Sequence, residues 1–349
     1  MELFNRNFGL QWHITNQCDQ RCKHCYIWGG GRSFKEHYKK ELDLEKCKSI
    51  VNKFIEFCKV FEVDPIIAIT GGDPLLFKWI WGLLEYFNQR NLSFIILGNP
   101  FHLDDVICER LRDLGCRAYQ MSLDGVEQTH DVIRKKGSFE STIKAIKILQ
   151  GVGIKTMIMS TISRFNYRDI PELIKKLVVD YRVDVYDFAR YSPALKDGGQ
   201  MLSPNEYRQF LSDAWGLYTD YMNYKTKFPL KDHLWRLFLY EKGLFQIRKE
   251  NIVFQGCGCG IRHLTLLPNG IVYACRRFKS PIGNILTQSF KDIFLGQKLE
   301  RYRKIKHLEG CKNCELLNYC RGCHAVSYGA FGDFFAKDPQ CWRLDGSVK

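Results

Sequence analysis

Three cysteines near the start of the chain constrain this sequence more than any other feature. Cys18, Cys22 and Cys25 form a C-x3-C-x2-C run, and Tyr26 follows directly. A cubane iron–sulfur cluster takes one protein ligand on each of its four irons, so three thiolates leave one iron open. An open metal position is where chemistry takes place, whereas a closed site is structural. Two alternatives are a chance grouping at a strand end and part of a zinc site.

The composition places the chain among globular proteins of a reducing compartment. Its 349 residues are enough for more than one domain. Of these residues 45% are hydrophobic and 26% charged, which is the balance of a globular protein. No apolar run reaches the length of a membrane span, and the segment Met1–Arg6 lacks a signal pattern. We therefore expect a cytoplasmic protein with no membrane partner, whose fifteen cysteines serve metal sites rather than disulfides.

The formal net charge of +14 bears on the partners. Lysine and arginine are scattered along the chain in short runs, such as Arg134-Lys135-Lys136. This distribution favours a solvated basic surface over a nucleic-acid groove, so we expect no nucleic-acid partner. The charge would still steer an acidic peptide or a carboxylated small molecule toward the protein.

Short apolar runs alternate with helical patterns over the first half of the chain. Strands are expected at Leu10–Ile14, Ile66–Thr70, Ser93–Leu97, Ala118–Ser122, Lys155–Thr161 and Val183–Arg190. Six strand–helix units predict parallel strands with crossover helices. Six are too few to close an eight-unit barrel, so the fold class is α/β with an open, partial (β/α)6 TIM-like barrel. Ligands of such folds lie at the carboxyl ends of the strands, where the first cysteine run falls.

Three regions follow from the composition. Residues 1–200 form the partial barrel, 201–253 a helical connection, and 254–349 a small cysteine-rich domain. The connection contains a strong helix start at Ser203, where proline follows and Glu206 completes a capping box. Eight of the fifteen cysteines lie between 257 and 341.

The run from Gln11 to Tyr26 resembles the cluster loop of the radical S-adenosylmethionine (SAM) superfamily. The resemblance implies a [4Fe–4S] cluster on Cys18, Cys22 and Cys25, with SAM chelating the open iron and Tyr26 beside the cofactor. An electron from a donor such as flavodoxin or ferredoxin would then cleave SAM to methionine and a 5′-deoxyadenosyl radical.

Two further motifs resemble the SAM-binding half of that superfamily. Gly71-Gly72-Asp73-Pro74 is similar to its Gly-Gly-Glu-Pro motif, which binds the SAM amino group, although Asp73 replaces the longer glutamate. The stretch from Ser122 to Gly137 is similar to its Ser-Leu-Asp-Gly…His-Asp…Arg…Gly pattern.

By this resemblance Ser122 and Arg134 contact the SAM ribose or carboxylate, while His130 is structural. The guanidinium fork of an arginine is well matched to a carboxylate. From their positions near strand ends, Ser160 and Arg190 are expected to face the pocket, Ser160 toward the cofactor and Arg190 toward the substrate.

The eight cysteines of the last region have the right number for two four-ligand sites, and zinc would fit the count as well. Their spacing resembles the SPASM extension of radical SAM maturases, which carries two auxiliary clusters. A departure is Cys320-x2-Cys323, where the family has Cys-x3-Cys. The family's crossed topology would assign Cys257, Cys259, Cys275 and Cys323 to the first auxiliary cluster. It would assign Cys311, Cys314, Cys320 and Cys341 to the second. Three [4Fe–4S] clusters and SAM are then the expected cofactors.

The remaining cysteines, Cys47, Cys58, Cys108 and Cys116, are expected to be buried apolar residues.

The resemblance implies a radical SAM oxidoreductase that matures a peptide by a thioether or carbon–carbon link, an epimerisation or an oxidation. In sulfatase-maturing relatives an aspartate that acts as the catalytic base directly follows the cysteine equivalent to Cys275. Here that position is Arg276, which disfavours formylglycine chemistry. Arg276 and Arg277 instead favour an acidic substrate. The few residues before the first strand leave no room for a fused leader-binding domain, so leader recognition would need a separate leader-binding protein or the barrel's own surface. No catalytic residue is assigned.

Two alternatives remain at this point. One is a radical SAM enzyme that acts on a carboxylated small molecule such as a haem precursor. The other is a non-catalytic zinc-binding protein that interacts with partners.

Overall fold

The computed structural model describes residues 7–27, 41–193, 199–247, 253 and 255–344. Its centre is one nine-stranded sheet in the order β6-β5-β4-β3-β2-β1-β7-β8-β9. The strands are β1 (Asn7–Thr15), β2 (Asp64–Gly71), β3 (Phe94–Leu97), β4 (Cys116–Ser122), β5 (Lys155–Ile162), β6 (Val185–Arg190), β7 (His263–Leu266), β8 (Ile271–Tyr273) and β9 (Pro281–Asn284). The first six pair in parallel and in sequence order, which confirms the partial α/β barrel.

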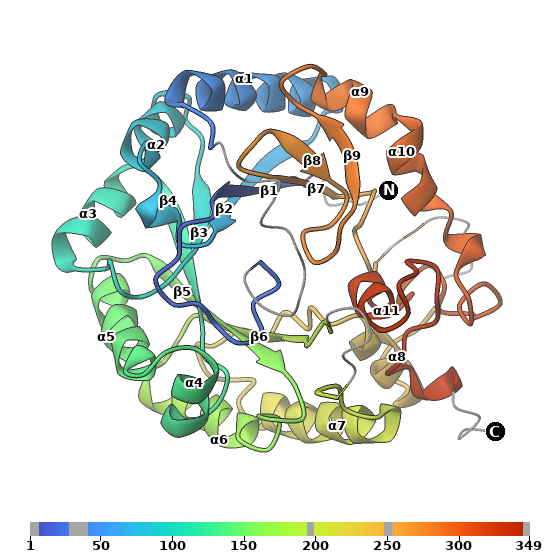
Figure 1. Ribbon diagram of the computed structural model, residues 1–349. Helices are drawn as coiled ribbons and strands as arrows, with labels where there is room; N and C mark the ends of the chain where they lie inside the picture. Colours follow the sequence, from blue (N-terminus) through green and yellow to red (C-terminus); the bar gives the residue numbers. More distant parts are fainter. Residues whose placement is uncertain (1–6, 28–40, 194–198, 248–252, 254, 345–349) are drawn as a thin grey trace.

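Helices surround this sheet (Figure 1). They are α1 (Leu44–Val60), α2 (Ile80–Gln89), α3 (Asp105–Asp113), α4 (Glu127–Ile133), α5 (Ser138–Gly151), α6 (Ile170–Lys175), α7 (Pro204–Asp220), α8 (Leu234–Glu241), α9 (Phe290–Leu295), α10 (Gln297–Glu300) and α11 (His324–Phe331). The capping box expected at the start of α7 is present, because Ser203 Oγ accepts the Glu206 N–H and Glu206 accepts the Ser203 N–H. Among the described residues, no helix has both the length and the apolar character needed to cross a membrane.

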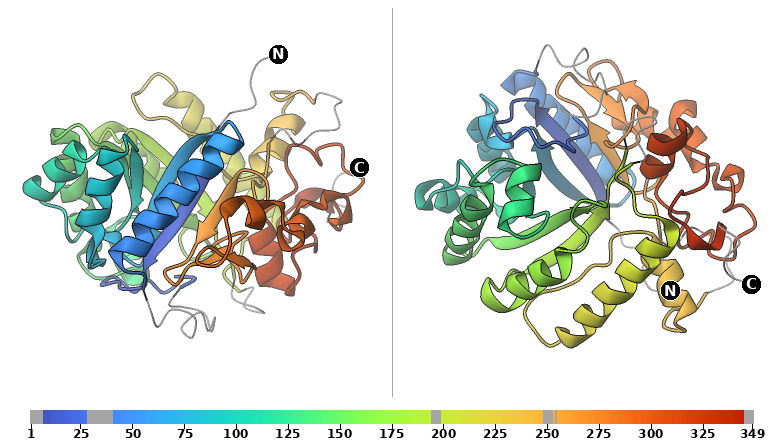
Figure 2. Two further views of the ribbon diagram at one scale, coloured as in Figure 1. Left: turned by 90° about the horizontal axis from the view of Figure 1, so that it is seen from above. Right: turned by 60° about the horizontal axis from the view of Figure 1, so that its bottom comes forward.

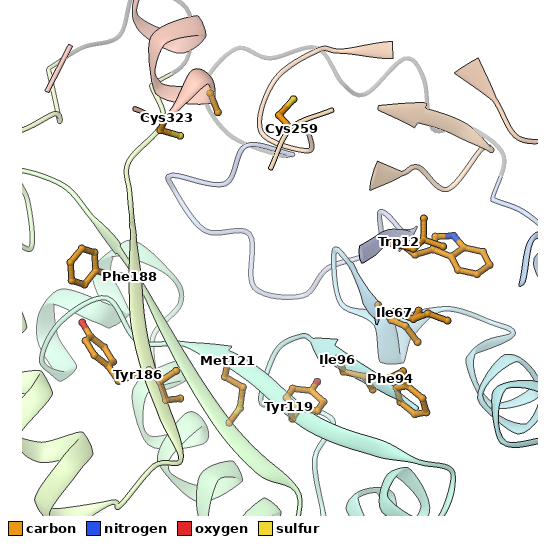
Figure 3. Close-up of a cluster of buried hydrophobic side chains, with 14 of the residues drawn as sticks. Trp12, Ile67, Phe94, Ile96, Tyr119, Met121, Tyr186, Phe188, Cys259 and Cys323 are labelled. Carbon is orange, nitrogen blue, oxygen red and sulfur yellow. The ribbon is translucent and has the colours of Figure 1, made fainter. Parts of the chain in front are cut away.

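The core lies between the strands and the helices rather than inside the barrel. Trp12, Phe94 and Phe188 are fully buried and point outward from the strands (Figure 3). Along β5, the outward-facing positions are buried, whereas the alternate inward-facing side chains keep partial exposure. The inward-facing side chains of β5 are thus less tightly covered than its outward-facing ones.

The cysteine-rich region completes the ring instead of forming a detached unit. Strand β7 pairs in parallel with β1, with Gly9 opposite His263, so the region extends the barrel sheet. Phe290 and Phe294 of α9 pack edge-on against Phe54 and Phe57 of α1. Figures 1 and 2 show this orange-to-red segment between α1 and α7. The three-region division of the sequence did not anticipate this continuity, because strands of three or four residues carry no clear periodic signal.

Candidate functional site

The first cysteine run lies in the loop that follows β1, which crosses one end of the barrel (Figure 1). Cys18, Cys22 and Cys25 all keep partial solvent exposure. Two donors from other elements approach their sulfurs: Asn99 Nδ2 lies 3.4 Å from Cys18 Sγ, and Arg134 Nη1 lies 3.4 Å from Cys22 Sγ. Donors of this kind stabilise thiolates, which are the metal-binding form of cysteine.

Gly71 and Gly72 allow this loop to lie directly on β2. The Gly72 N–H donates to Thr15 O at 2.8 Å. A Cβ on Gly71 would lie 2.2 Å from Thr15 O, and one on Gly72 would lie 2.0 Å from Gln17 O. Gly71 also has a φ of +141°, which favours glycine. The close approach expected at these glycines is therefore an approach to the backbone of the cysteine loop, and contact with SAM stays a prediction.

Asp73 caps the turn after β2. It is fully buried, and its Oδ1 accepts the Leu75 N–H at 3.3 Å. Its Oδ2 has no hydrogen-bond partner among the described residues, and burial raises the pKa of the carboxyl to about 6. An acceptor position is therefore left for a donor such as an ammonium group, although the short side chain holds it away from solvent.

Asp124 and Arg134 brace the cysteine loop from the β4 side. Arg134 Nε lies 2.5 Å from Asp124 Oδ2, and Asp124 Oδ1 accepts the Thr161 N–H at 2.7 Å. Although burial opposes ionisation, Arg134 and His24 hold the pKa of Asp124 at about 2. Arg134, expected to contact SAM, is thus oriented by Asp124 toward Cys22.

His130 belongs to the same brace. The Asp124 N–H donates to His130 Nδ1 at 3.1 Å, so the opposite nitrogen donates to Ser138 Oγ at 2.6 Å. Gln20 of the cysteine loop also donates to Ser138 Oγ. Burial lowers the pKa of His130 to about 4 and keeps it neutral. These contacts agree with the structural role expected of His130.

The two serines expected near the cofactor, Ser122 and Ser160, differ in their exposure to solvent. Ser122 ends β4 and keeps partial exposure. Ser160 is fully buried, donates to Leu123 O and accepts from Tyr186 Oη at 3.1 Å. The expectation that Ser160 faces the pocket is wrong, because the two-residue period of β5 turns its side chain toward the helices.

Arg190 is also buried and committed to protein partners. Its Nε donates to Asp232 Oδ2 at 2.8 Å, and its Nη1 and Nη2 donate to the two oxygens of Asp338 at 2.7 and 2.8 Å. The expected substrate contact of Arg190 is therefore replaced by a link between β6 and the cysteine-rich region. The partner residues lie 42 and 148 positions away, so no local pattern announces them.

The structure groups the eight later cysteines into the two expected sets. In the first set, burial raises the pKa of Cys257 to about 12, and the neighbouring Cys323 and Cys275 raise it further. Burial, followed by the neighbouring Cys257, Cys275 and Cys323, raises the pKa of Cys259 well above its usual range. In the second set one small cavity is shared by Cys311, Cys314, Cys320 and Cys341.

The cysteine sulfurs of the described residues lie further apart than one bound zinc ion would hold them. Four sulfurs that bind one zinc at about 2.3 Å lie about 3.8 Å apart. Among the described residues, no three cysteine sulfurs all lie within 4.8 Å of one another. A cubane cluster holds its ligands further apart than one ion does. The binding of three iron–sulfur clusters by these eleven cysteines stays a prediction.

Each of the three sets has a guanidinium at one sulfur. Arg134 lies at Cys22 of the loop, and Arg277 Nη1 lies 3.4 Å from Cys323 Sγ. Arg343 Nη1 lies 4.0 Å from Cys314 Sγ. Neither the arginine at Cys323 nor the one at Cys314 was predicted to make such a contact.

A group of cations lies inside the barrel beside the cysteine loop. The Arg276 guanidinium lies 5.8 Å from the centre of the Tyr26 ring, whose hydroxyl is 3.3 Å from His13 Nε2. The pKa of Lys231 is lowered to about 8. Desolvation is the largest cause, and the positive charges of Arg276 and Arg277 lower it as well. Lys231 is nevertheless exposed to solvent. Sequence reasoning missed Lys231, which belongs to no motif.

Comparison with known proteins agrees with this geometry. The sequence profile of the radical SAM superfamily matches residues 12–177. A profile described as an iron–sulfur cluster-binding domain, SPASM, matches residues 257–324. The chain belongs to the radical SAM superfamily. This radical SAM protein is therefore an enzyme that uses SAM and iron–sulfur clusters.

Relatives and solved structures cover almost the whole chain. An AdoMet-dependent heme synthase of Methanosarcina barkeri is 28% identical over 95% of this chain and 95% of its own length. Mycofactocin maturase MftC of Mycolicibacterium smegmatis is 25% identical over 95% of this chain and 82% of its own. The crystal structure of Streptococcus suis SuiB bound to S-adenosylmethionine has a TM-score of 0.75 and 16% identity, and the match covers 96% of this chain and 77% of that one. The structural match shows a shared fold.

Proposed function

We propose that this enzyme removes hydrogen from a carboxylate-bearing substrate held inside the barrel. Cys18, Cys22 and Cys25 would hold the SAM-binding cluster, and the two later sets of four cysteines would hold two auxiliary clusters. When bound, the first cluster and SAM supply a 5′-deoxyadenosyl radical. Gly71 and Gly72 position the loop that carries the first cluster, while Arg134 and Asp124 orient it.

The group of interior cations is the observation that carries this proposal. Lys231, Arg276 and Arg277 are near enough for the two arginines to lower the pKa of the lysine, and Asp187 is the carboxylate that acts on Lys231 in the opposite direction. Cations in a partly desolvated site are stabilised by anions. Because the positive groups outnumber this carboxylate, one or more substrate carboxylates would complete the site.

A carboxylated tetrapyrrole is the first candidate. Its several carboxylates would match Lys231 and Arg276, and an arginine fork binds a carboxylate through two parallel hydrogen bonds. The names of relatives support this choice, since AdoMet-dependent heme synthases of Methanosarcina barkeri and Oleidesulfovibrio alaskensis both match 95% of the chain.

A peptide with an acidic residue near the modified position is the second candidate. Mycofactocin maturases match the same 95% of the chain at 25% to 26% identity. An acidic side chain would enter the barrel and meet Arg276, while the rest of the peptide stays at the barrel mouth. A separate leader-binding protein would then bring the peptide to the enzyme.

One anaerobic experiment compares the two candidates. The reconstituted enzyme receives SAM and dithionite, with either a propionate-bearing iron porphyrin or an acidic peptide, and 5′-deoxyadenosine formation is measured. The porphyrin should shift its absorption spectrum on titration and stimulate cleavage. The Cys18→Ala, Cys22→Ala, Cys25→Ala variant should abolish cleavage while keeping the iron of two clusters.

Variants of the cation group test the carboxylate contact. Lys231→Gln and Arg276→Gln should raise the substrate KM about tenfold or more, as expected for loss of a charge-assisted contact worth about 1.5–3 kcal/mol. Lys279→Gln is the matched control, because Lys279 is exposed and close in sequence. Unchanged KM in both variants would contradict the proposed substrate class.

A further inference from the structure

We propose that a basic surface beside the cysteine loop docks an acidic one-electron donor protein of the flavodoxin or ferredoxin kind. This surface, here termed the basic rim, consists of Arg21, Lys23, Lys135 and Lys136. The inference rests on the proposed cluster at the first cysteine run, and it adds where the electron donor binds.

The basic rim is built by two segments that are far apart in sequence. The Lys23 N–H donates to Ile133 O at 2.9 Å, and Lys135 Nζ donates to Asp19 O at 3.1 Å. These contacts fasten the cysteine loop to the end of α4. All four rim residues are nevertheless exposed, so their charges face solvent.

The basic rim adjoins the cysteine loop at Cys22. Arg21 and Lys23 flank Cys22 in sequence, and Arg134, next to Lys135, reaches Cys22 Sγ at 3.4 Å. Because electron transfer slows steeply with distance, a donor protein must dock close to the metal centre that it reduces. A protein bound on the rim meets this requirement.

The acidic residues near the rim do not cancel its charge. Asp19 contacts Asn99 Nδ2 at 2.8 Å and His102 Nε2 at 3.0 Å. Asp131 accepts the backbone N–H groups of Gly137 and Phe139. A surface with four exposed cations therefore favours an acidic partner, since complementary charge accelerates encounter and fixes orientation. The substrate cations at Lys231 and Arg276 form a different group inside the barrel.

Charge reversal combined with two reductants tests the proposal. The variant Lys23→Glu, Lys136→Glu is compared with Lys291→Glu, Lys298→Glu, which changes the same charge at exposed lysines of α9 and α10, on the other side of the ring in Figure 1. Formation of 5′-deoxyadenosine is measured with reduced flavodoxin and with dithionite. Binding of oxidised flavodoxin is measured separately at low and high salt, and iron is counted in every preparation.

The rim variant should lose about tenfold or more of its flavodoxin-driven rate and most of its salt-dependent flavodoxin binding. Its dithionite-driven rate and iron content should equal those of the wild type and of the control variant. An unchanged flavodoxin-driven rate overturns the proposal. An increased substrate KM with dithionite also overturns it, because the rim would then serve the substrate. If the wild type forms no 5′-deoxyadenosine with dithionite, the proposed function is refuted. The separate measurement of flavodoxin binding would still test whether the basic rim docks the donor.

Discussion

At the scale of single residues, the three cysteine sets share one arrangement: a guanidinium approaches one sulfur in each. The two shorter contacts, Arg134 to Cys22 and Arg277 to Cys323, are both 3.4 Å. Arg277 also donates to the carbonyl oxygen of Arg190 at the end of β6, so its fork is held on two sides. Hydrogen bonds and positive charge at a ligating sulfur stabilise the reduced cluster and raise its potential.

We predict that Arg277→Met lowers the reduction potential of the first auxiliary cluster, because the reduced state loses a donor and a positive charge. The potential is measured by a redox titration followed by electron paramagnetic resonance, in the background that lacks Cys18, Cys22 and Cys25. Lys279→Met is the control for charge alone. If the variant retains its iron and has the same reduction potential as its parent, Arg277 does not tune the potential of this cluster.

We predict that Gly72→Ala displaces the cysteine loop, since the new Cβ would lie 2.0 Å from Gln17 O. SAM affinity should fall at least about tenfold, and iron at the first site should be partly lost. Gly151→Ala, in α5, is the matched control because nothing lies within 4 Å of the Cβ position there. This control should be neutral or slightly more stable, as expected for a helical alanine. Normal SAM affinity in Gly72→Ala would contradict the packing role of this glycine.

At the scale of elements, Arg190 ties β6 to the segment that carries both auxiliary sets. Asp338, which receives two of its hydrogen bonds, also accepts the Cys323 N–H at 2.7 Å and lies three residues before Cys341. Arg190 and Asp338 are each only 1% exposed in their side chains, so their ion pair is shielded from solvent. One buried arginine thus connects the barrel wall to a cysteine of each auxiliary set.

We predict that Arg190→Met is strongly destabilising, because it leaves the buried Asp232 and Asp338 carboxylates without their cation. The loss should be about 3–5 kcal/mol, seen as a lower urea midpoint, together with loss of auxiliary iron. Arg164→Met provides the contrast: its ion pair with Glu206 is exposed and should be worth about 0–1 kcal/mol. Similar midpoints for the two variants would refute a structural role for Arg190.

At the scale of the whole molecule, two groups of cations lie at different depths. The basic rim is on the surface, and Lys231, Arg276 and Arg277 are inside the barrel. This separation would let a donor protein and a carboxylated substrate bind at the same time. It also makes the interior group sensitive to pH, because the pKa of Lys231 is lowered to about 8.

We predict that the substrate KM rises severalfold between pH 7 and pH 9. Lys231 is charged below its pKa of about 8 and becomes neutral above it, so attraction for a substrate carboxylate is present at low pH and lost as the pH rises. Lys231→Arg should flatten this profile, because arginine stays charged. A wild-type profile that is flat from pH 7 to 9 would show that Lys231 does not bind the substrate.

The sequence by itself determined the features that are written locally. The six barrel strands lie within three residues of their expected ends, because each carries a short stretch rich in apolar residues between turns. The two cysteine sets were assigned only from family resemblance, whereas the cysteine loop and the capping box of α7 were predicted from spacing within short stretches. Such signals depend on neighbours along the chain and need no knowledge of the fold.

Only the tertiary structure decided which distant residues meet. The pairing of β7 with β1, the link from Arg190 to Asp338 and the approach of Lys231 to Arg276 all join positions separated by 45 or more residues. The outward turn of Ser160 likewise depends on which face of β5 the helices cover. These contacts arise because closing the barrel brings strand ends and loops together at one end, and no local pattern encodes that closure.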